Sequence, residues 1–373
     1  MSTSEIAPDE LRDSFKQLLR QESDAIASEA KSGRGKEAGE ALLSKMAELG
    51  WLGITIDEQY GGLGLDFTAL GILYEELGRS VAPAAVMPTM LAAEALQRCG
   101  SESQKSKWLP LLASGELAAS LGLPFHGDQS DRRHSVAHIL HADTKNLLLL
   151  PVAVSDGSMG LALIPPLAVG VTVEARPLID LTRTLCTVRV NVSDLRSEQV
   201  MPVTAADWDR LLDHACVGLA CDSVGGADRI LERTVEYMQL RRQFDAPIGS
   251  FQALKHRVAT WKILLESVRA LTDHATHVLA AGGNDASTVA SAAKYSACDA
   301  YAAIAGDAVQ LHGGIGFTWE HDCHLFLKRA KLNAVLFGTA IQHKERIARC
   351  VLGKDLDETE VPSPLLAIEA PTV

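Results

Sequence analysis

The sequence lacks several patterns that would place it in a specialised class. Its seven cysteines, an odd number, contain no CxxC pair, so we expect free thiols in a reducing compartment and neither disulfide bridges nor a zinc-stapled fold. No apolar run approaches the roughly 18 residues of a membrane span, and the first residues show no signal-peptide pattern, so we expect a soluble cytoplasmic chain. Lys and Arg number 35 against 47 Asp and Glu, and this net charge of -12 argues against a nucleic-acid partner.

Length and composition are otherwise those of an ordinary globular protein. At about 150 residues per domain, 373 residues predict two to three compact units rather than one. Hydrophobic residues make up 47% and charged residues 22% of the chain, which argues against a disordered or collagen-like polymer. The chain is therefore long and apolar enough to bury a large core.

The spacing of the apolar residues changes twice along the chain. Residues 1–117 show apolar positions three or four apart and predict an N-terminal α-helical domain. Residues 118–204 contain short runs such as NLLLLPVAV and CTVRVNV between turn residues, and they predict a small β barrel or sandwich. Residues 205–355 return to helical spacing and predict an antiparallel four-helix bundle, with a loose tail at 356–373. The predicted fold class is therefore α+β.

Two common catalytic motifs are missing. A nicotinamide-binding βαβ unit needs a GxGxxG turn directly after a strand, whereas the glycine clusters at residues 61–64 and 313–316 follow a helix or a loop. The GxSxG motif of serine hydrolases is absent as well.

Histidines cluster once, at His321 and His324 around Cys323, with His312 close in sequence. These are metal-ligating residue types, but their spacing matches no common metal site, and the stretch begins a helix. We therefore expect exposed or hydrogen-bonded side chains here and no metal.

A basic motif closes the first long helix of the bundle. Arg241 and Arg242 are followed by Gln243 and Phe244 just before a turn that contains Pro and Gly. Arginine forks and a glutamine suit pyrophosphate oxygens, and a phenylalanine can pack against an aromatic cofactor ring. The same residues also suit a helix C-terminus, where positive charge is favourable. The motif alone leaves both interpretations open.

Longer stretches of the chain resemble the flavin-dependent acyl-CoA dehydrogenase family. The resemblance covers nearly the whole chain, and it implies the same order of helical domain, β domain and four-helix bundle. It rests on RRQFDAPIGSFQALKHRVA at residues 241–259, AVQLHGGIGFTWEHDCHLFLKRAKL at 308–332, the N-terminal stretch at 46–83, and KWLPLLASGELAASLGLP at 107–124.

The resemblance implies FAD shared across a subunit interface. In the family, the β domain of one subunit holds the isoalloxazine, and the bundle of its neighbour grasps the adenine dinucleotide part. Glycine lets the backbone approach a pyrophosphate closely, and glutamine offers both a donor and an acceptor. Transferred residue by residue, the bundle contacts fall on Arg241, Gln243 and Phe244, and on Gln310, Gly313 and Gly314.

The catalytic base of the family is missing from both of its known positions. The family removes the α proton of an acyl-CoA thioester with a carboxylate while the β hydride passes to the flavin. The two positions hold Phe337 and Ala215 here, and neither side chain can take a proton. Asp213 and Asp222 lie on the same helix as Ala215, and we keep them only as weak substitutes because neither shares its face.

The β domain departs from the family as well. Gly122-Leu123-Pro124, followed by residues 125–128, replaces the Thr-Glu-Pro and Gly-Ser-Asp motifs whose hydroxyls hold the flavin ring. The aromatic and threonine strand that covers the flavin is not recognisable around residues 137–145. Bundle contacts to a neighbour's FAD are thus kept, while residues of the chain's own site are lost.

This asymmetry predicts a subunit that works with a second acyl-CoA dehydrogenase-like subunit and completes its FAD site. Such unequal pairs resemble bacterial heterotetrameric enzymes that oxidise CoA thioesters of steroid side chains, and an electron-transfer flavoprotein is an expected acceptor. Two alternatives stay open from the sequence. One is a flavin-dependent monooxygenase, which needs no carboxylate base, and the other is a non-catalytic scaffold subunit.

Overall fold

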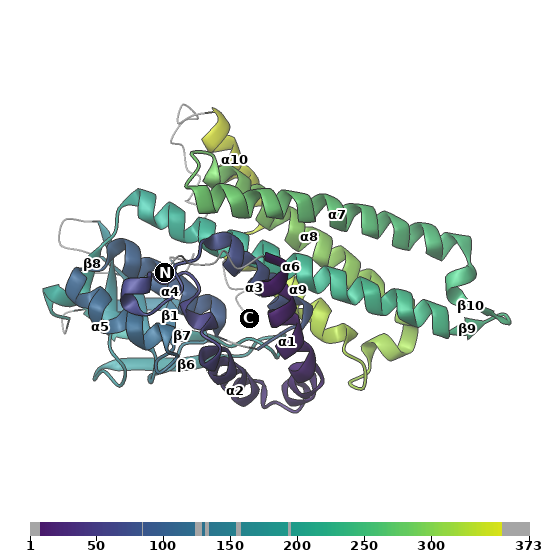
Figure 1. Ribbon diagram of the computed structural model, residues 1–373, viewed down its shortest axis with the longest axis horizontal. Helices are drawn as coiled ribbons and strands as arrows, with labels where there is room; N and C mark the ends of the chain where they lie inside the picture. Colours follow the sequence, from purple (N-terminus) through teal and green to yellow (C-terminus); the bar gives the residue numbers. More distant parts are fainter. Residues whose placement is uncertain are drawn as a thin grey trace.

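A computed structural model describes residues 8–83, 85–123, 129–130, 134–153, 158–192 and 195–352 (Figure 1). The N-terminal helices and the β-strands lie at one end, and long helices extend from them toward the other end. The residues from Pro124 to Asp128 and the predicted tail at 356–373 lie outside the described part of the chain. The N-terminal helices are α1 (Pro8–Lys31), α2 (Gly35–Glu48), α3 (Phe67–Arg79), α4 (Val86–Cys99) and α5 (Glu102–Ala113).

Local sequence signals account for the starts of these helices. Pro8 opens α1, and acidic residues occupy its first turn, where they favour the positive end of the helix dipole. The Asp66 side chain caps α3 by accepting from the Thr68 amide at 2.8 Å. Ser101 and Gln104 form a reciprocal capping box at the start of α5.

The middle of the chain forms two four-stranded sheets, as the prediction of a barrel or sandwich requires. Their orders are β1-β4-β5-β8 and β2-β3-β7-β6. One apolar cluster lies mainly among the helices, and a separate one contains side chains of both sheets, including Ile139, Leu150, Ile164 and Val188. The strands are β1 (Ala119–Leu121), β2 (Gln129–Ser130), β3 (His134–Leu140), β4 (Leu147–Ala153), β5 (Met159–Ile164), β6 (Val171–Arg176), β7 (Leu185–Asn191) and β8 (Val200–Pro202).

The C-terminal part is the predicted helical bundle, with a short additional helix packed against it. Small residues let its helices approach α3 closely. A Cβ at Gly78 would overlap the carbonyl oxygen of Asp222, and one at Gly225 would overlap that of Glu75. The helices are α6 (Ala205–Leu240), α7 (Gln252–Ala281), α8 (Ala286–His312), α9 (Cys323–Val335) and α10 (Ala340–Leu352). Among the described helices, none is long and apolar enough to cross a membrane.

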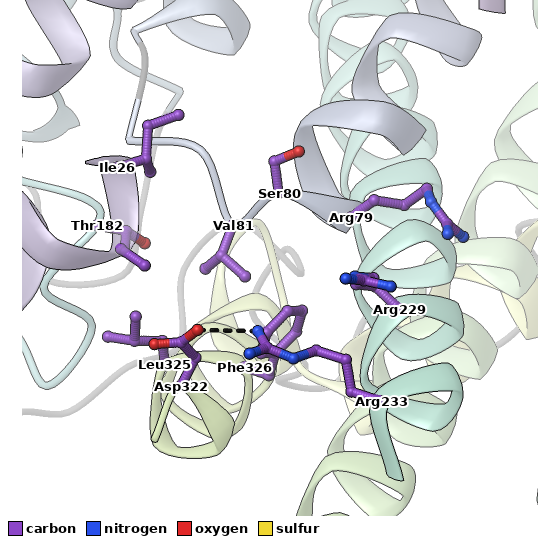
Figure 2. Close-up of a pocket in the computed structure, with 11 residues that line it drawn as sticks. Ile26, Arg79, Ser80, Val81, Thr182, Arg229, Arg233, Asp322, Leu325 and Phe326 are labelled. Atoms are coloured by element: carbon purple, nitrogen blue, oxygen red, sulfur yellow. Dashed lines mark hydrogen bonds and ion pairs between the residues drawn. The ribbon is translucent and has the colours of Figure 1, made fainter. Parts of the chain in front are cut away.

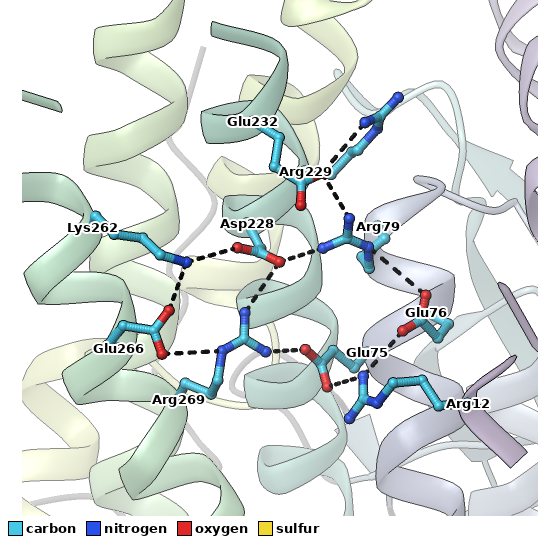
Figure 3. A network of polar contacts seen from close by, with 10 residues as sticks. All are labelled: Arg12, Glu75, Glu76, Arg79, Asp228, Arg229, Glu232, Lys262, Glu266 and Arg269. Atoms are coloured by element: carbon cyan, nitrogen blue, oxygen red, sulfur yellow. Dashed lines mark hydrogen bonds and ion pairs between the residues drawn. The ribbon is translucent and has the colours of Figure 1, made fainter. Parts of the chain in front are cut away.

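A network of ion pairs fastens α1 and α3 to α6 and α7 (Figure 3). Arg12 lies 2.8 Å from Glu75 and 3.0 Å from Glu76. Arg269 of α7 pairs with the same Glu75 and lies 3.2 Å from Asp228 of α6. Because several of these side chains are partly exposed, each pair contributes little alone, and the network acts mainly by fixing how the helices cross.

A second network, around the buried side chain of Arg329, joins all three parts of the chain. Its guanidinium lies 2.8 Å from Asp180 in the β6–β7 loop and 3.1 Å from Asp222 of α6. It also donates to the carbonyl of Ala82, between α3 and α4, at 3.1 Å. Burial alone would raise the pKa of Asp180, but the charges of Arg329 and Arg183 lower it. Arg183 lies 3.1 Å from Asp222, so two arginines face two aspartates.

Replacing Arg329 with methionine should strongly destabilise the protein. The change leaves two buried carboxylates with one cation, and breaking a buried pair in this way costs about 3–5 kcal/mol of unfolding free energy. Thermal and urea unfolding of the purified protein measure this loss. The control is Arg189→Ala, because the Arg189 and Glu174 side chains are 44% and 59% exposed and their pair should contribute under about 1 kcal/mol.

The deficit of the Arg329→Met variant should also depend on pH. The pKa of Asp180 is lower in the folded protein than the pKa of about 3.9 expected in the unfolded chain. The ion pairs of Asp180 therefore stabilise the wild type at pH values above about 3.9, and this stabilisation is lost as the pH falls through the folded pKa. The variant and the wild type should therefore converge in acid. A deficit that is small at pH 7, or no larger than that of Arg189→Ala, would contradict the role given to this network.

Candidate functional site

The Arg241–Phe244 motif lies at the end of the bundle far from the sheets (Figure 1). The sequence suggested that the motif closes the helix, but α6 ends at Leu240 and the motif enters a hairpin of β9 (Arg242–Gln243) and β10 (Ala246–Pro247). Phe244 and Asp245 form its two-residue turn with φ of 52° and 59°. Left-handed φ at both positions is typical of a type I′ turn, which is usually built from Asn and Gly. Phe244 thus occupies a costly conformation at the tip of the hairpin.

The second predicted motif lies at the same end of the bundle. The Tyr237 ring of α6 stacks on His312 at 4.4 Å, and its hydroxyl donates to the His312 carbonyl at 3.3 Å. The chain then turns through Gly313, which has φ of 63°. An added Cβ at Gly313 or Gly314 would meet nothing within 4 Å, so the backbone is open to an approaching ligand.

We call this region the bundle tip, defined as residues 240–251 and 310–319. Arg241, Gln243 and Gln310 are exposed there. Apolar side chains are exposed beside them, with Phe244 at 89% and Phe317 at 76%. Exposed aromatic residues next to charged and amide groups suit a partner surface or a ligand with a ring and phosphates. The contacts between Tyr237 and His312 thus place the two predicted FAD motifs at the same end of the bundle, with exposed residues in each.

The two base positions lie in the buried interior. Phe337 is 6% exposed, and Ala215 is fully buried. They belong to neighbouring segments, because His343 Nε2 lies 3.1 Å from the Phe337 carbonyl oxygen and 3.9 Å from Sγ of Cys216. Burial lowers the pKa of His343 to about 3, so its ring is neutral near pH 7 and can donate to that carbonyl.

The weak substitutes Asp213 and Asp222 are both bound in buried ion pairs. Asp213 lies 2.6 Å from Arg346 of α10 and accepts from the Ser287 hydroxyl at 2.8 Å. Burial raises the pKa of Asp213, and the Arg346 charge opposes that rise. Asp222 belongs to the Arg329 network. Both carboxylates therefore join helices to one another, and each already has a cation beside it.

Two cavities border His141, within the stretch that would cover a flavin. One, of about 290 Å³, lies between α2 and the β region, and the other, of about 20 Å³, lies between the β region, α3, α4 and α6. The smaller cavity has room for about one water molecule and not for a tricyclic flavin ring. Burial lowers the pKa of His141 to about 3. A Cβ added at Gly122 would lie 3.1 Å from side-chain atoms of Ile139 and Pro151, so the described residues leave little free space beside Gly122.

A cavity that the sequence did not indicate lies between α1, α3, α6 and α9 (Figure 2). Its volume is about 80 Å³, and arginines 79, 229 and 233 line it. Each arginine already has an acidic partner: Arg79 has Asp228 and Glu232, Arg229 has Glu232 at 3.3 Å, and Arg233 has Asp322 at 2.9 Å. The arginines that line this cavity thus form ion pairs with neighbouring acidic side chains.

The structure also brings together part of the histidine cluster. Potential ligand atoms of His312, His321 and Cys323 lie within 4.8 Å of one another, and His324 is not among them. The spacing in sequence did not predict this group, because the ten residues between its ends fold back through the turn after α8.

Family models and a curated relative both match this chain to acyl-CoA dehydrogenases. The models of the acyl-CoA dehydrogenase N-terminal and C-terminal domains match residues 7–116 and 207–352. The acyl-CoA dehydrogenase IpdE2 of Mycolicibacterium smegmatis is 31% identical over 301 residues, which cover 80% of this chain and 84% of that protein.

Solved structures share the fold along nearly all of their length. A Tcur3481–Tcur3483 steroid ACAD variant is 25% identical with a TM-score of 0.80, covering 93% of this chain and 99% of the other. The ChsE4–ChsE5 complex of Mycobacterium tuberculosis contains a chain that is 22% identical with a TM-score of 0.81, covering 96% and 99%.

Placing a carboxylate at the buried base position should destabilise the protein. Phe337→Glu moves a charge into a segment that is 6% exposed, at a desolvation cost of several kcal/mol, so the melting temperature at pH 7 should fall by several degrees. Burial raises the pKa of such a carboxyl, so the deficit relative to wild type should shrink as the pH falls and the group becomes neutral. Phe337→Leu is the control for lost ring volume. An unchanged melting temperature, with deuterium exchange at the α carbon of an acyl-CoA, would show instead that a substrate cavity persists.

Proposed function

Because this chain belongs to the acyl-CoA dehydrogenase family, whose members are FAD-dependent oxidoreductases acting on CH–CH bonds, we propose that it is a base-lacking subunit that completes the FAD site of a partner subunit. The observation that carries the proposal is the contrast between two regions. The bundle tip presents Arg241, Gln243 and Gln310 to solvent, whereas the interior base positions hold Phe337 and Ala215.

The groups at the bundle tip fit the adenine dinucleotide half of FAD. The exposed Arg241 guanidinium can form charge-assisted hydrogen bonds with a pyrophosphate, and Gln310 can donate to and accept from the ribityl or adenosine groups. Gly313 and Gly314 leave the backbone open on the same surface. When bound, FAD supplies the acceptor for the β hydride of the substrate. This chain's residues would hold it in place and keep its phosphates paired.

The partner would have to supply the catalytic carboxylate and the flavin-ring contacts. In this chain, the cavity that borders Asp222 and Arg329 holds only about 20 Å³, and both Asp213 and Asp222 are already ion-paired. The partner is therefore a second acyl-CoA dehydrogenase-like chain that keeps a glutamate or aspartate at the base position.

The proposed substrate class is supported by similar solved structures. Solved structures similar to this chain include a steroid ACAD with two named components and the ChsE4–ChsE5 complex. These similarities support a CoA thioester of a steroid side chain as substrate and a heteromeric assembly. Electrons would pass from the reduced flavin to an electron-transfer flavoprotein.

Expressed alone, the chain should purify with little FAD and without dehydrogenase activity on acyl-CoA substrates. Gly122 and Leu123 offer no side-chain hydroxyl to a flavin ring, and Phe337 and Ala215 cannot remove an α proton. An absorption spectrum of the purified protein and a dye-reduction assay measure both properties. A partner chain can be identified by pull-down with this chain. Co-expression of the two chains should give a yellow, active complex. A yellow and active homo-oligomer would contradict the proposal and would direct attention to Asp213 or Asp222.

In the complex, Arg241→Ala should weaken FAD retention. Loss of one charge-assisted contact of about 1.5–3 kcal/mol should raise the dissociation constant of FAD roughly ten- to a hundred-fold. Fluorescence of FAD released during gel filtration or dilution measures the effect. Arg189→Ala, at an exposed position of strand β7, is the matched control and should retain FAD like the wild type. Unchanged retention in Arg241→Ala would mean that the motif only shapes the end of α6.

A further inference from the structure

Three metal-ligating side chains meet where α8 ends and α9 begins. His312 is the last residue of α8, Cys323 is the first residue of α9, and His321 lies in the loop between them. Potential ligand atoms of the three residues lie within 4.8 Å of one another. His312 and Cys323 are buried, and His321 is half-buried. The group is therefore enclosed by protein but accessible from one side.

The hydrogen bonds of His312 orient one of its nitrogens as a ligand. Its Nδ1 lies 2.8 Å from the Ala308 carbonyl oxygen, which can only accept, so Nδ1 carries the proton. The lone pair of the neutral ring is then on Nε2. That atom is buried and has no hydrogen-bond partner among the described residues, and the side chain is 3% exposed. A ring held by a backbone carbonyl on one nitrogen, with the other left open, is the usual arrangement of a metal-bound histidine.

The other two residues complete a ligand set of a recognisable kind. The His321 ring lies 4.6 Å from the His312 ring, and its Nδ1 lies 3.2 Å from the Cys323 amide nitrogen. Cys323 is fully buried beside them. Two imidazoles and one thiolate suit a borderline-soft ion such as Zn²⁺, whereas Mg²⁺ and Ca²⁺ prefer oxygen ligands.

We propose that His312, His321 and Cys323 bind one Zn²⁺ ion, with the fourth tetrahedral position open to water. Tetrahedral zinc brings its ligand atoms to about 3.5 Å from one another, so the half-buried His321 must move inward by about 1 Å. If His321 binds through Nδ1, it exchanges the Cys323 amide hydrogen bond for the metal. The Cys323 thiol gives its proton to solvent when the Zn–S bond forms, and no electron is transferred.

Zinc at this position would act as a structural clamp. The segment between the ligands carries Gly313 and Gly314, together with the exposed Phe317 and Trp319 of the bundle tip. Joining His312 to Cys323 closes this ten-residue loop and restricts it in the folded state. The site does not depend on the proposed function, because its three ligands are not among the residues assigned to FAD.

Metal titration of the full-length, untagged chain tests the site. The protein is stripped with a chelator, dialysed and titrated with Co²⁺ and then Zn²⁺. We expect one equivalent of Co²⁺ per chain, a near-ultraviolet thiolate-to-cobalt band, visible bands of tetrahedral cobalt, and displacement of all these signals by Zn²⁺. Zinc should also raise the melting temperature, because it binds the folded chain.

Single-residue variants identify the ligands. Cys323→Ser should abolish the thiolate-to-cobalt band, and His321→Ala should weaken binding on the order of 100-fold. His321→Ala changes a half-buried loop residue, so it tests the site even where Cys323→Ser does not fold. Cys350→Ser and His277→Ala, at exposed positions elsewhere, are the controls and should bind like the wild type. Absence of stoichiometric binding, or equal binding by His321→Ala and the wild type, would overturn the proposal.

Discussion

The buried guanidinium of Arg329 is the contact on which the arrangement of the three parts depends. It donates hydrogen bonds to a carboxylate of the β6–β7 loop, a carboxylate of α6 and a carbonyl of the α3–α4 connection. Charges in this position contribute little net stability compared with well-packed apolar groups, because their desolvation cost is large. What they provide is selectivity for one geometry, since any shift between the parts would leave a buried charge unpaired. The relative positions of helices and sheets are thus set by charge pairing as well as by packing.

The same network explains why the interior does not resemble an open active site. Arg329, Arg183 and Asp222 all border the cavity of about 20 Å³ between the β sheets and the helices. Each of these side chains is already paired, so none has a free group for a substrate carbonyl or a flavin. The bundle tip is subject to no such constraint. It is built from the ends of α6 and α8, and its exposed groups can serve a second chain whatever fills the interior.

The sequence predicted those features that depend on local spacing. The helices and most strands follow from apolar periodicity, whereas the assignment of the two bundle-tip motifs to FAD rests on the family resemblance and stays a prediction. Strand β3 was missed because its seven residues, HSVAHIL, show neither a regular alternation of polar and apolar residues nor the continuous apolar run that marks β4. The β9–β10 hairpin was missed because its turn uses Phe244 and Asp245, where sequence rules expect Asn and Gly. The Arg329 network could not be predicted, because its members meet only after distant segments have packed. The residues His312, His321 and Cys323 were noticed as a cluster in the sequence, but that their side chains meet depends on the turn between α8 and α9.

The loop at Phe337, one of the two predicted base positions, is held in shape by contacts of its backbone. Phe337 has φ of 55° and Gly338 has φ of 111°, so two successive residues adopt left-handed backbone conformations. For Phe337 this costs on the order of 1 kcal/mol, and the surroundings must offset it. They do so through the backbone. His343 donates to the carbonyl of Phe337, and the buried Lys294 ammonium donates to the carbonyls of Ala334 and Gly338.

None of these contacts uses the side chain of residue 337, so the backbone of the loop is held by groups that do not depend on the chemistry of that side chain. The Phe337 ring itself packs in the apolar core, where an acid would lose apolar burial and add a desolvation cost. Under the proposed function, an assembly that contains one complete site would need only the bundle tip from this chain. An aromatic ring at position 337 would then support the core where a catalytic acid would weaken it.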